Sequence, residues 1–224
     1  MKSKFYNYLL ILFLNIFFIN ASIAIEQFKF NITELEITDK GNLIKGSKGG
    51  VAKTADGVEI IGNTFIYNKI TNILEVIGNV KFIDKQKDTV INSDKATYLK
   101  NDEIVFTEGN SESFNESYKI SAVNFKFDKK QNVLTAEKNV KFIDKQKDTV
   151  INSDKATYLK NDEIVFTEGK TTAIIEKEYK ITSSDVTFLK KLNNLSSKEK
   201  SFVEDGNKNT YELDDFFYKC VNSN

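Results

Sequence analysis

The stretch Asn79–Gly109, NVKFIDKQKDTVINSDKATYLKNDEIVFTEG, decides the fold, because the same letters return unchanged from Asn139 to Gly169. A globular domain with one closed core cannot absorb such a copy, since each core position has its own densely packed neighbours. A stack of repeated units can absorb it, since each unit contacts only the next one. The copy therefore predicts a repetitive protein that grows along one direction.

The repeat is finer than the copy, because aromatic residues recur about every thirty positions. These aromatic residues are Tyr67, Tyr98, Phe127, Tyr158 and Phe188. Seven residues before each of them stands an isoleucine: Ile60, Ile91, Ile120, Ile151 and Ile181. Two residues before each stands another apolar residue: Phe65, Ala96, Phe125, Ala156 and Val186. A period of two, with polar residues between, predicts strands that turn this side inward.

Each unit is predicted to contain two strands joined by short turns. In Ile73–Asp84 the apolar Leu74, Val76, Val80 and Phe82 share one face, and polar residues share the other. The segments IGNV, TEGN, EKNV and TEGK are predicted to mark unit boundaries, and the pairs NN, ND and QN to mark turns within units, because Asn, Asp and Gly tolerate the backbone of tight turns. The fold class predicted from this period is all-β: a roll of stacked two-strand units of about 30 residues.

The first residues have the layout of a secretory signal peptide. Lys2 and Lys4 precede an apolar run from Leu9 to Ile19, and a cut is expected after Ala24. An uncleaved anchor is the alternative, although the run is shorter than the roughly 20 residues of a spanning helix. We therefore predict a signal peptide at 1–24 and one domain at 25–224, with an irregular lead-in at 25–57, repeat units at 58–200 and a degenerate end at 201–224.

Composition argues against several classes of function. The chain carries 32 basic and 32 acidic residues, has no histidine and contains no arginine, so no nucleic-acid partner, metal, cofactor or enzymatic activity is expected. Asp84, Asp88 and Asp94 recur in the copy but alternate with lysines, which predicts a mixed-charge surface and not a calcium site. The lone cysteine, Cys220, is either a free thiol or a disulfide link to another chain.

The recurring aromatic residues have two interpretations. They fill a closed core, or they line an apolar trough between two walls that do not fully close.

The segments DTVINSDKATYLKNDEIVFTEGN and VEIIGNTFIYNKITNILEVIGNVKFID resemble the OstA-like domain shared by LptA, LptC and the amino-terminal part of LptD. The resemblance covers roughly residues 28–190. It implies a V-shaped β-jellyroll, open on one side, that holds the acyl chains of lipopolysaccharide and performs no chemistry. It also implies a periplasmic location at or near the outer membrane, and partners that are other lipopolysaccharide transport components joined end to end by strand pairing.

The resemblance also assigns the interior, lipid-binding positions. These are Ile60, Phe65, Tyr67, Val80, Phe82, Ile91, Ala96, Tyr98, Ile120, Phe125, Phe127, Val140, Phe142, Ile151, Ala156, Tyr158, Ile181, Val186 and Phe188.

Several alternatives stay open at the level of sequence. Within the family, the chain corresponds to an LptA-like bridge, to a shortened LptD without its barrel, or to an LptC-like protein if the first segment stays uncleaved. Outside it, a secreted β-solenoid adhesin with a closed core would give the same periodicity. A polysaccharide lyase is a third class, which the absence of histidine and arginine disfavours.

Overall fold

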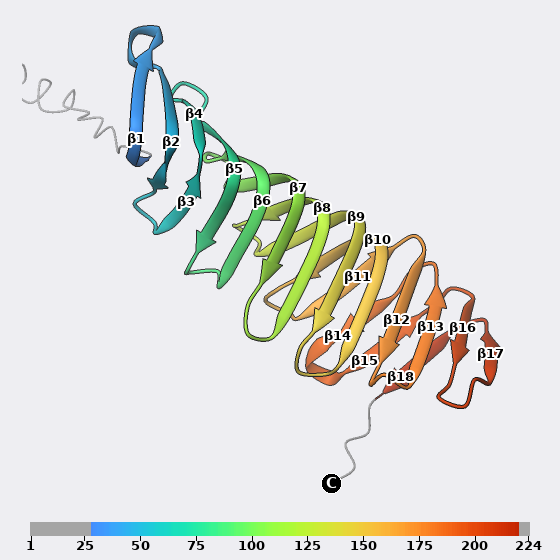
Figure 1. The fold of residues 1–224 in the computed structure, drawn as a ribbon. Coiled ribbons are helices and arrows are strands. Elements are labelled where there is room, and N and C mark those ends of the chain that lie inside the picture. Colours follow the sequence, from blue (N-terminus) through green and yellow to red (C-terminus); the bar gives the residue numbers. More distant parts are fainter. Residues whose placement is uncertain (1–27, 220–224) are drawn as a thin grey trace, which may run out of the picture.

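The computed structural model describes residues 28–219, so the predicted signal peptide and Cys220 lie outside the described residues. This part of the chain is all-β, as predicted, and its 18 strands form one antiparallel sheet that runs along the molecule (Figure 1). Two short 3-10 turns, η1 (Asp39–Gly41) and η2 (Lys190–Leu192), complete it. The strands are β1 (Lys29–Thr38), β2 (Leu43–Lys53), β3 (Val58–Gly62), β4 (Thr64–Asn68), β5 (Ile73–Asp84), β6 (Thr89–Leu99), β7 (Ile104–Phe114), β8 (Tyr118–Asp128), β9 (Val133–Asp144), β10 (Thr149–Leu159), β11 (Ile164–Glu168), β12 (Thr171–Ile175), β13 (Tyr179–Ser183), β14 (Thr187–Leu189), β15 (Asn194–Ser197), β16 (Ser201–Glu204), β17 (Thr210–Leu213) and β18 (Phe216–Lys219).

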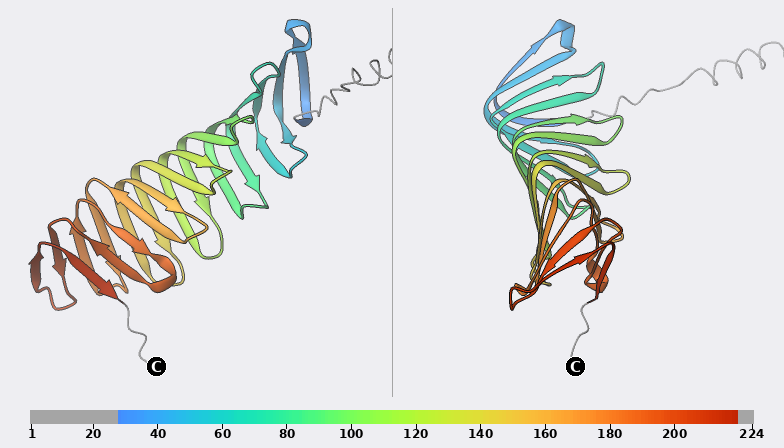
Figure 2. Two further views of the ribbon diagram at one scale, coloured as in Figure 1. Left: turned by 180° about the vertical axis from the view of Figure 1, so that it is seen from behind. Right: turned by 90° about the vertical axis from the view of Figure 1, so that its right-hand side faces the viewer.

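The long strands β5 to β10 each bend in the middle, so that one sheet forms two facing walls (Figure 2). At the bend the pairing of β5 with β6 steps from Ile77 opposite Lys95 to Val80 opposite Ser93, which leaves one extra residue in β5. Such a bulge kinks a strand and increases its twist. In β5 the bulge contains Gly78 and Asn79, whose φ angles are +80° and +50°.

The segments IGNV, TEGN and EKNV therefore do not separate strands, contrary to the prediction from sequence. They lie inside β5, β7 and β9 at the bend, and only TEGK falls between two strands, β11 and β12. The physical reason is that the left-handed backbone tolerated by Gly and Asn serves a bulge as well as a turn.

The bend also explains why, in each unit, the interior isoleucine and the interior aromatic residue are seven positions apart. An odd spacing would place them on opposite faces of a regular strand. In β6 the buried positions run Ile91, Ser93, Ala96 and Tyr98, so a three-residue step at the bend returns both halves to the inner side. Ile91 and Tyr98 thus face the interior from different walls.

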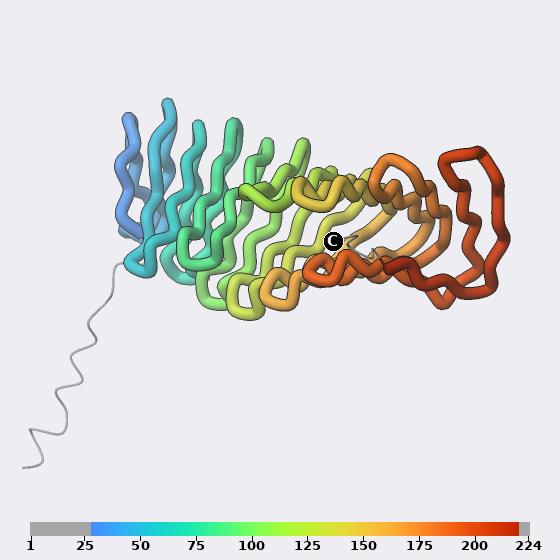
Figure 3. Tube along the Cα trace, turned by 90° about the horizontal axis from the view of Figure 1, so that it is seen from below, coloured from blue at the N-terminus to red at the C-terminus, as the bar shows by residue number. Residues whose placement is uncertain are grey.

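We define wall A as β4, β11, β14, β15 and β18, and wall B as β3, β12, β13, β16 and β17, each continued by one half of every long strand. Opposite the bend, the hairpin turns of the two walls face each other, and we call this edge the mouth. Seen from below, the strands follow one another in chain order from one end of the stack to the other (Figure 3).

Both ends of the stack present strand edges. Among residues 28–219, β1 pairs only with β2, β17 only with β16 and β18 only with β15. No helix in this range has the length and apolar character needed to cross a membrane.

Candidate functional site

The interior between the two walls is the candidate site, and every interior residue assigned by the resemblance is buried there. The largest exposed fraction among them is 4%, at Tyr67. Wall A contributes the five recurring aromatic residues and the apolar residue two positions before each of them. Wall B contributes the five isoleucines and the pairs Val80–Phe82 and Val140–Phe142. Their burial is a matter of geometry, and their role in binding lipid stays a prediction.

Leu74 and Val76 were predicted on the apolar face of Ile73–Asp84, but the interior residues on the corresponding strands of the later units were missed. The missed residues of wall A are Val105, Leu134, Ala136, Val165 and Leu195. Their period of two was visible in Leu74 and Val76, and the same signal applied to the following units would have found the rest. Tyr118, fully buried in wall B, was also missed, although it lies two positions before the predicted interior residue Ile120 and follows the same period.

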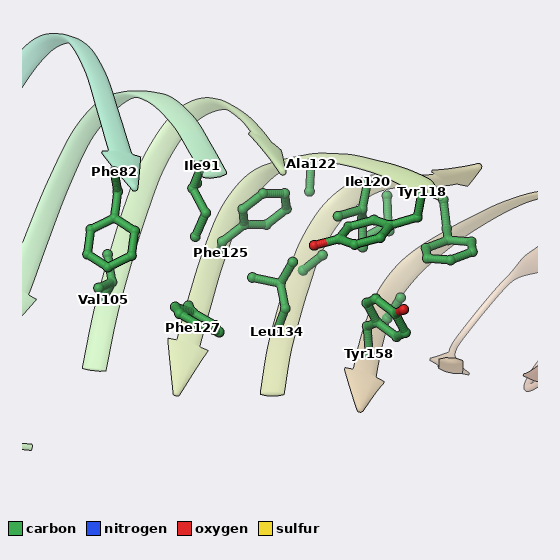
Figure 4. Close-up of a cluster of buried hydrophobic side chains, with 14 of the residues drawn as sticks. Phe82, Ile91, Val105, Tyr118, Ile120, Ala122, Phe125, Phe127, Leu134 and Tyr158 are labelled. Carbon is green, nitrogen blue, oxygen red and sulfur yellow. The ribbon is translucent and has the colours of Figure 1, made fainter. Parts of the chain in front are cut away.

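Aromatic rings from the two walls touch each other across the interior (Figure 4). Phe82 of wall B lies edge-on to Tyr98 and Phe127 of wall A, with ring centroids 5.8 and 6.2 Å apart. One duplication later, Phe142 makes the same contacts with Tyr158 and Phe188 at 5.5 and 6.3 Å. Edge-to-face pairs are the preferred packing of aromatic rings. The walls are therefore in direct contact, and the interior is filled by side chains.

The interior changes chemistry from the bend to the mouth. Next to the bend lie buried hydroxyl groups that bond one another, as between Thr107 and Ser111 at 2.7 Å and between Ser153 and Thr171 at 2.9 Å. The middle is apolar, and the mouth is charged.

Five lysines, which we call the mouth lysines, follow the interior aromatic residues of wall A by two positions each. They are Lys69, Lys100, Lys129, Lys160 and Lys190. Lys69, at the N-terminal end, is exposed, whereas Lys129 and Lys190 are 4% exposed. The four later ones reach across the mouth to wall B. The sequence analysis missed this row, although its thirty-residue period was readable.

Carboxylates of wall B hold three of these lysines. Asp56 accepts hydrogen bonds from Lys100 at 3.0 Å and from Lys129 at 2.5 Å. Burial would raise the pKa of Asp56, but hydrogen bonds from Lys129, Thr54 and Lys100 outweigh it and hold that pKa well below its usual range. Asp56 is therefore ionised at neutral pH and bridges the mouth near the N-terminal end.

The other two carboxylates are copies of each other. Asp84 and Asp144 are fully buried, and the Oδ1 of each accepts two backbone N–H bonds of its own turn. The Oδ2 of each has no hydrogen-bond partner and lies 3.7 Å from Lys129 and 3.6 Å from Lys190, respectively. These pairs attract by charge without a hydrogen bond.

Lys160 is held differently, by neutral oxygens of wall B. Its ammonium donates to the carbonyl oxygens of Lys87 at 2.8 Å and Asp88 at 2.9 Å, and to the Thr89 hydroxyl. The ammonium also lies 5.8 Å from the ring centroids of Tyr118 and Phe127. Burial lowers the pKa of Lys160 to about 8, because its charge is stripped of water and only partly compensated by Asp88 and Asp84.

Three surface hollows lie outside this interior. They are lined around β1, β2 and β4, around β7 and β8, and around β11, β14 and β18. Of the predicted interior residues, only Phe65 and Val186 line any of them. In the described residues, no group of three His, Cys, Asp or Glu side chains could hold a metal ion.

No family model matches the chain, and no curated protein matches it. Among solved structures, it is similar to LptH of Pseudomonas aeruginosa, described as the LptA-homologous periplasmic component of the conserved lipopolysaccharide transport device. The superposition covers 47% of this chain and 78% of LptH, with 13% sequence identity and a TM-score of 0.44. A likeness this loose transfers no residue roles, so function is argued below from the interior itself.

Proposed function

We propose that this chain is a non-enzymatic carrier of lipopolysaccharide, which holds the acyl chains between its two walls on the way to the outer membrane. The observation that carries the proposal is the way the interior is closed. Backbone hydrogen bonds of the described residues run along the walls, while the contacts across the mouth are made by side chains such as Lys129 and Asp56. The walls can thus part at the mouth while their hydrogen-bond ladders stay intact.

The energetics of the interior support a lipid cargo. Each methylene group that moves from water into such an interior contributes about 0.8 kcal/mol. Parting the walls exposes aromatic pairs such as Phe82 with Tyr98, and acyl chains would replace that contact area. The sequence resemblance to the OstA-like domain independently implies the same class of cargo.

The ends of the stack support a place in a chain of proteins. Unpaired strand edges accept a further strand by β-augmentation. We therefore assign three strand edges as the surfaces that join neighbouring transport components in the periplasm. They are β1 at one end of the stack, and β17 of wall B and β18 of wall A at the other. An LptA-like bridge and the amino-terminal part of an LptD both fit these edges.

A secreted β-solenoid with a permanently closed core is the second candidate. The packing favours it directly: the predicted interior residues are at most 4% exposed and the mouth is bridged by charged side chains. The two candidates differ in whether the walls ever part.

Photocrosslinking to lipopolysaccharide separates the candidates. Probes replace Phe65, Phe125 and Phe188, and matched controls replace the exposed Lys81 and Lys126. A carrier gives crosslinks at the three interior probes and none at the controls. Equal labelling of all five positions, or no labelling, rejects the carrier and leaves the solenoid.

A further inference from the structure

Lys100, Lys129 and Lys190 each face an aspartate that lies 44 to 46 positions earlier in the sequence, and Lys160 departs from this pattern. Lys129 faces Asp84 and Asp56, which lie 45 and 73 positions before it. The residues 45 and 73 positions before Lys160 are Asn115 and Lys87. An amide and a second lysine thus stand where Lys129 has two carboxylates.

Asn115 takes the structural place of the missing aspartate. Its Oδ1 accepts the backbone N–H groups of Ser117 and Tyr118, as Asp84 Oδ1 accepts those of Gln86 and Lys87. The turn is therefore built the same way, but the Asn115 side chain itself carries no negative charge. Lys145 donates to the Asn115 carbonyl at 2.5 Å, which adds another cation to this part of the mouth.

Asp88, the acid that contacts the Asn115 turn, is already engaged. Asp88 Oδ2 accepts a hydrogen bond from the Asn115 amide at 2.7 Å, and it is the backbone carbonyl of Asp88 that contacts Lys160. The ammonium of Lys160 is consequently a cation between neutral acceptors, directly above the interior rings of Tyr118 and Phe127.

We propose that Lys160 binds the phosphate of an anionic amphiphile at the mouth, while the acyl chains of the same molecule lie between the walls below it. The inference rests on the proposed carrier function and names the headgroup chemistry of its cargo. A phosphate supplies the charged acceptor that Lys160 lacks, and charge-assisted hydrogen bonds of this kind are about twice as strong as neutral ones. At Lys100, Lys129 and Lys190 the phosphate would first have to displace a carboxylate.

The duplication offers a matched control for this site. Lys100 stands in the identical 31-residue segment of the first copy but is paired with Asp56. The test uses the full chain in neutral detergent micelles, titrated calorimetrically with phosphatidic acid, with diacylglycerol of the same acyl chains, and with inorganic phosphate. The variants are Lys160→Met, Lys100→Met and Asn115→Asp, the last of which keeps the lysine and replaces the neutral amide beside Asp88 with a carboxylate.

We expect phosphatidic acid to bind the unmodified chain about tenfold more tightly than diacylglycerol. Lys160→Met and Asn115→Asp should abolish this preference, and Lys100→Met should preserve it. Equal effects of the two methionine variants, or no preference for phosphatidic acid, overturn the inference alone. Inorganic phosphate that binds as tightly as phosphatidic acid would identify a free-phosphate site and also overturn it. Failure of both lipids to bind overturns the carrier function as well.

Discussion

At the scale of single residues, Lys160 is a stability cost at neutral pH. Its pKa is about 8 in the folded chain against 10.5 for an unperturbed lysine. Between these values the unfolded chain binds more protons, so the contribution of Lys160 to the free energy of unfolding rises with pH across this window. Burial raises the pKa of its neighbour Tyr118 to about 12, which keeps that phenol from titrating there.

Lys160→Met should therefore stabilise the protein at pH 7, by roughly 1–3 kcal/mol, because it keeps the aliphatic packing and removes a poorly compensated charge. The gain over the unmodified chain should shrink as pH rises from 8 to 10.5. Urea denaturation of both proteins at pH 7 and pH 10 measures this. A gain that is independent of pH would contradict the assignment of the cost to the charge.

Asp56 acts in the opposite sense, because its folded pKa lies below the unperturbed value of 3.8. Its stabilising contribution is fully present above pH 3.8 and is lost as pH falls through the lower folded value. Asp56→Asn should cost about 2 kcal/mol at pH 7, since it leaves Lys129, a lysine 4% exposed, with Asp84 at 3.7 Å and Glu103 at 4.0 Å and no carboxylate within hydrogen-bond distance.

The free energies of unfolding at pH 7 and at pH 3 test this. The control is Asp102→Asn, because Asp102 is an exposed turn residue of wall A. The control should change stability by less than about 0.5 kcal/mol. Equal losses in the two variants would show that Asp56 does not bridge the mouth.

At the scale of elements, the bend depends on a left-handed backbone inside a continuous strand. Gly109 in β7 has φ +73°, and a Cβ added there would lie 2.4 Å from Asp94 Oδ2. Gly57, in the turn before β3, has φ +89° with nothing within 4 Å of such a Cβ. The two glycines separate the cost of the backbone conformation from the cost of the clash.

Gly57→Ala should lower the free energy of unfolding by about 1 kcal/mol, from backbone strain alone. Gly109→Ala should lower it further, because Asp94 must also move. Thermal or urea denaturation of both variants gives the difference. If Gly109→Ala costs no more than Gly57→Ala, the bend tolerates a side chain and is softer than its geometry implies.

Strands and their inward faces could be predicted from sequence because both depend on a local period of two. Ile73–Asp84 was predicted as a strand with Leu74, Val76, Val80 and Phe82 on one face, and it is β5 with those residues buried. The bend could not be placed, because Gly and Asn accept the same left-handed backbone in a bulge as in a turn. The odd seven-residue spacing was its only signal.

The pairing of side chains across the mouth could not be predicted from sequence, for a different reason. Lys129 and Asp56 lie 73 positions apart and meet only because the two walls bring them together. No local period marks such a contact, since the partners belong to different units. The interior positions, by contrast, follow from the period within each unit.

At the scale of the whole molecule, the two identical segments do not have identical surroundings. Lys100 and Lys160 stand at the same place in the copy, yet Lys100 meets Asp56 and Lys160 meets neutral oxygens. The difference comes from the units placed before each segment, because the contacts across the mouth reach backwards along the stack. Duplication has therefore added length and created a new mouth environment in one step.

Deletion of residues 79–138 should yield a folded, shorter protein. It joins Gly78 to Asn139 and restores the sequence that already follows Gly78 in the full chain, so the junction lies at a bend of the same composition. Four strands are lost, which shortens the stack by roughly 19 Å at the usual strand spacing. Small-angle scattering measures the length, and circular dichroism measures the retained β structure.

The same deletion predicts a change at the mouth. Lys160 then occupies the place of Lys100 opposite Asp56, and Asp144, still opposite Lys190, takes the place of Asp84. The carboxylate of Asp56 should raise the pKa of Lys160 above its value in the full chain, and Lys160→Met should cease to stabilise the shortened protein at pH 7, because the lysine now has a carboxylate partner. Urea denaturation of the shortened protein with and without the substitution measures this. A stabilisation as large as in the full chain would mean that the cost belongs to the position of the lysine and not to its partners across the mouth.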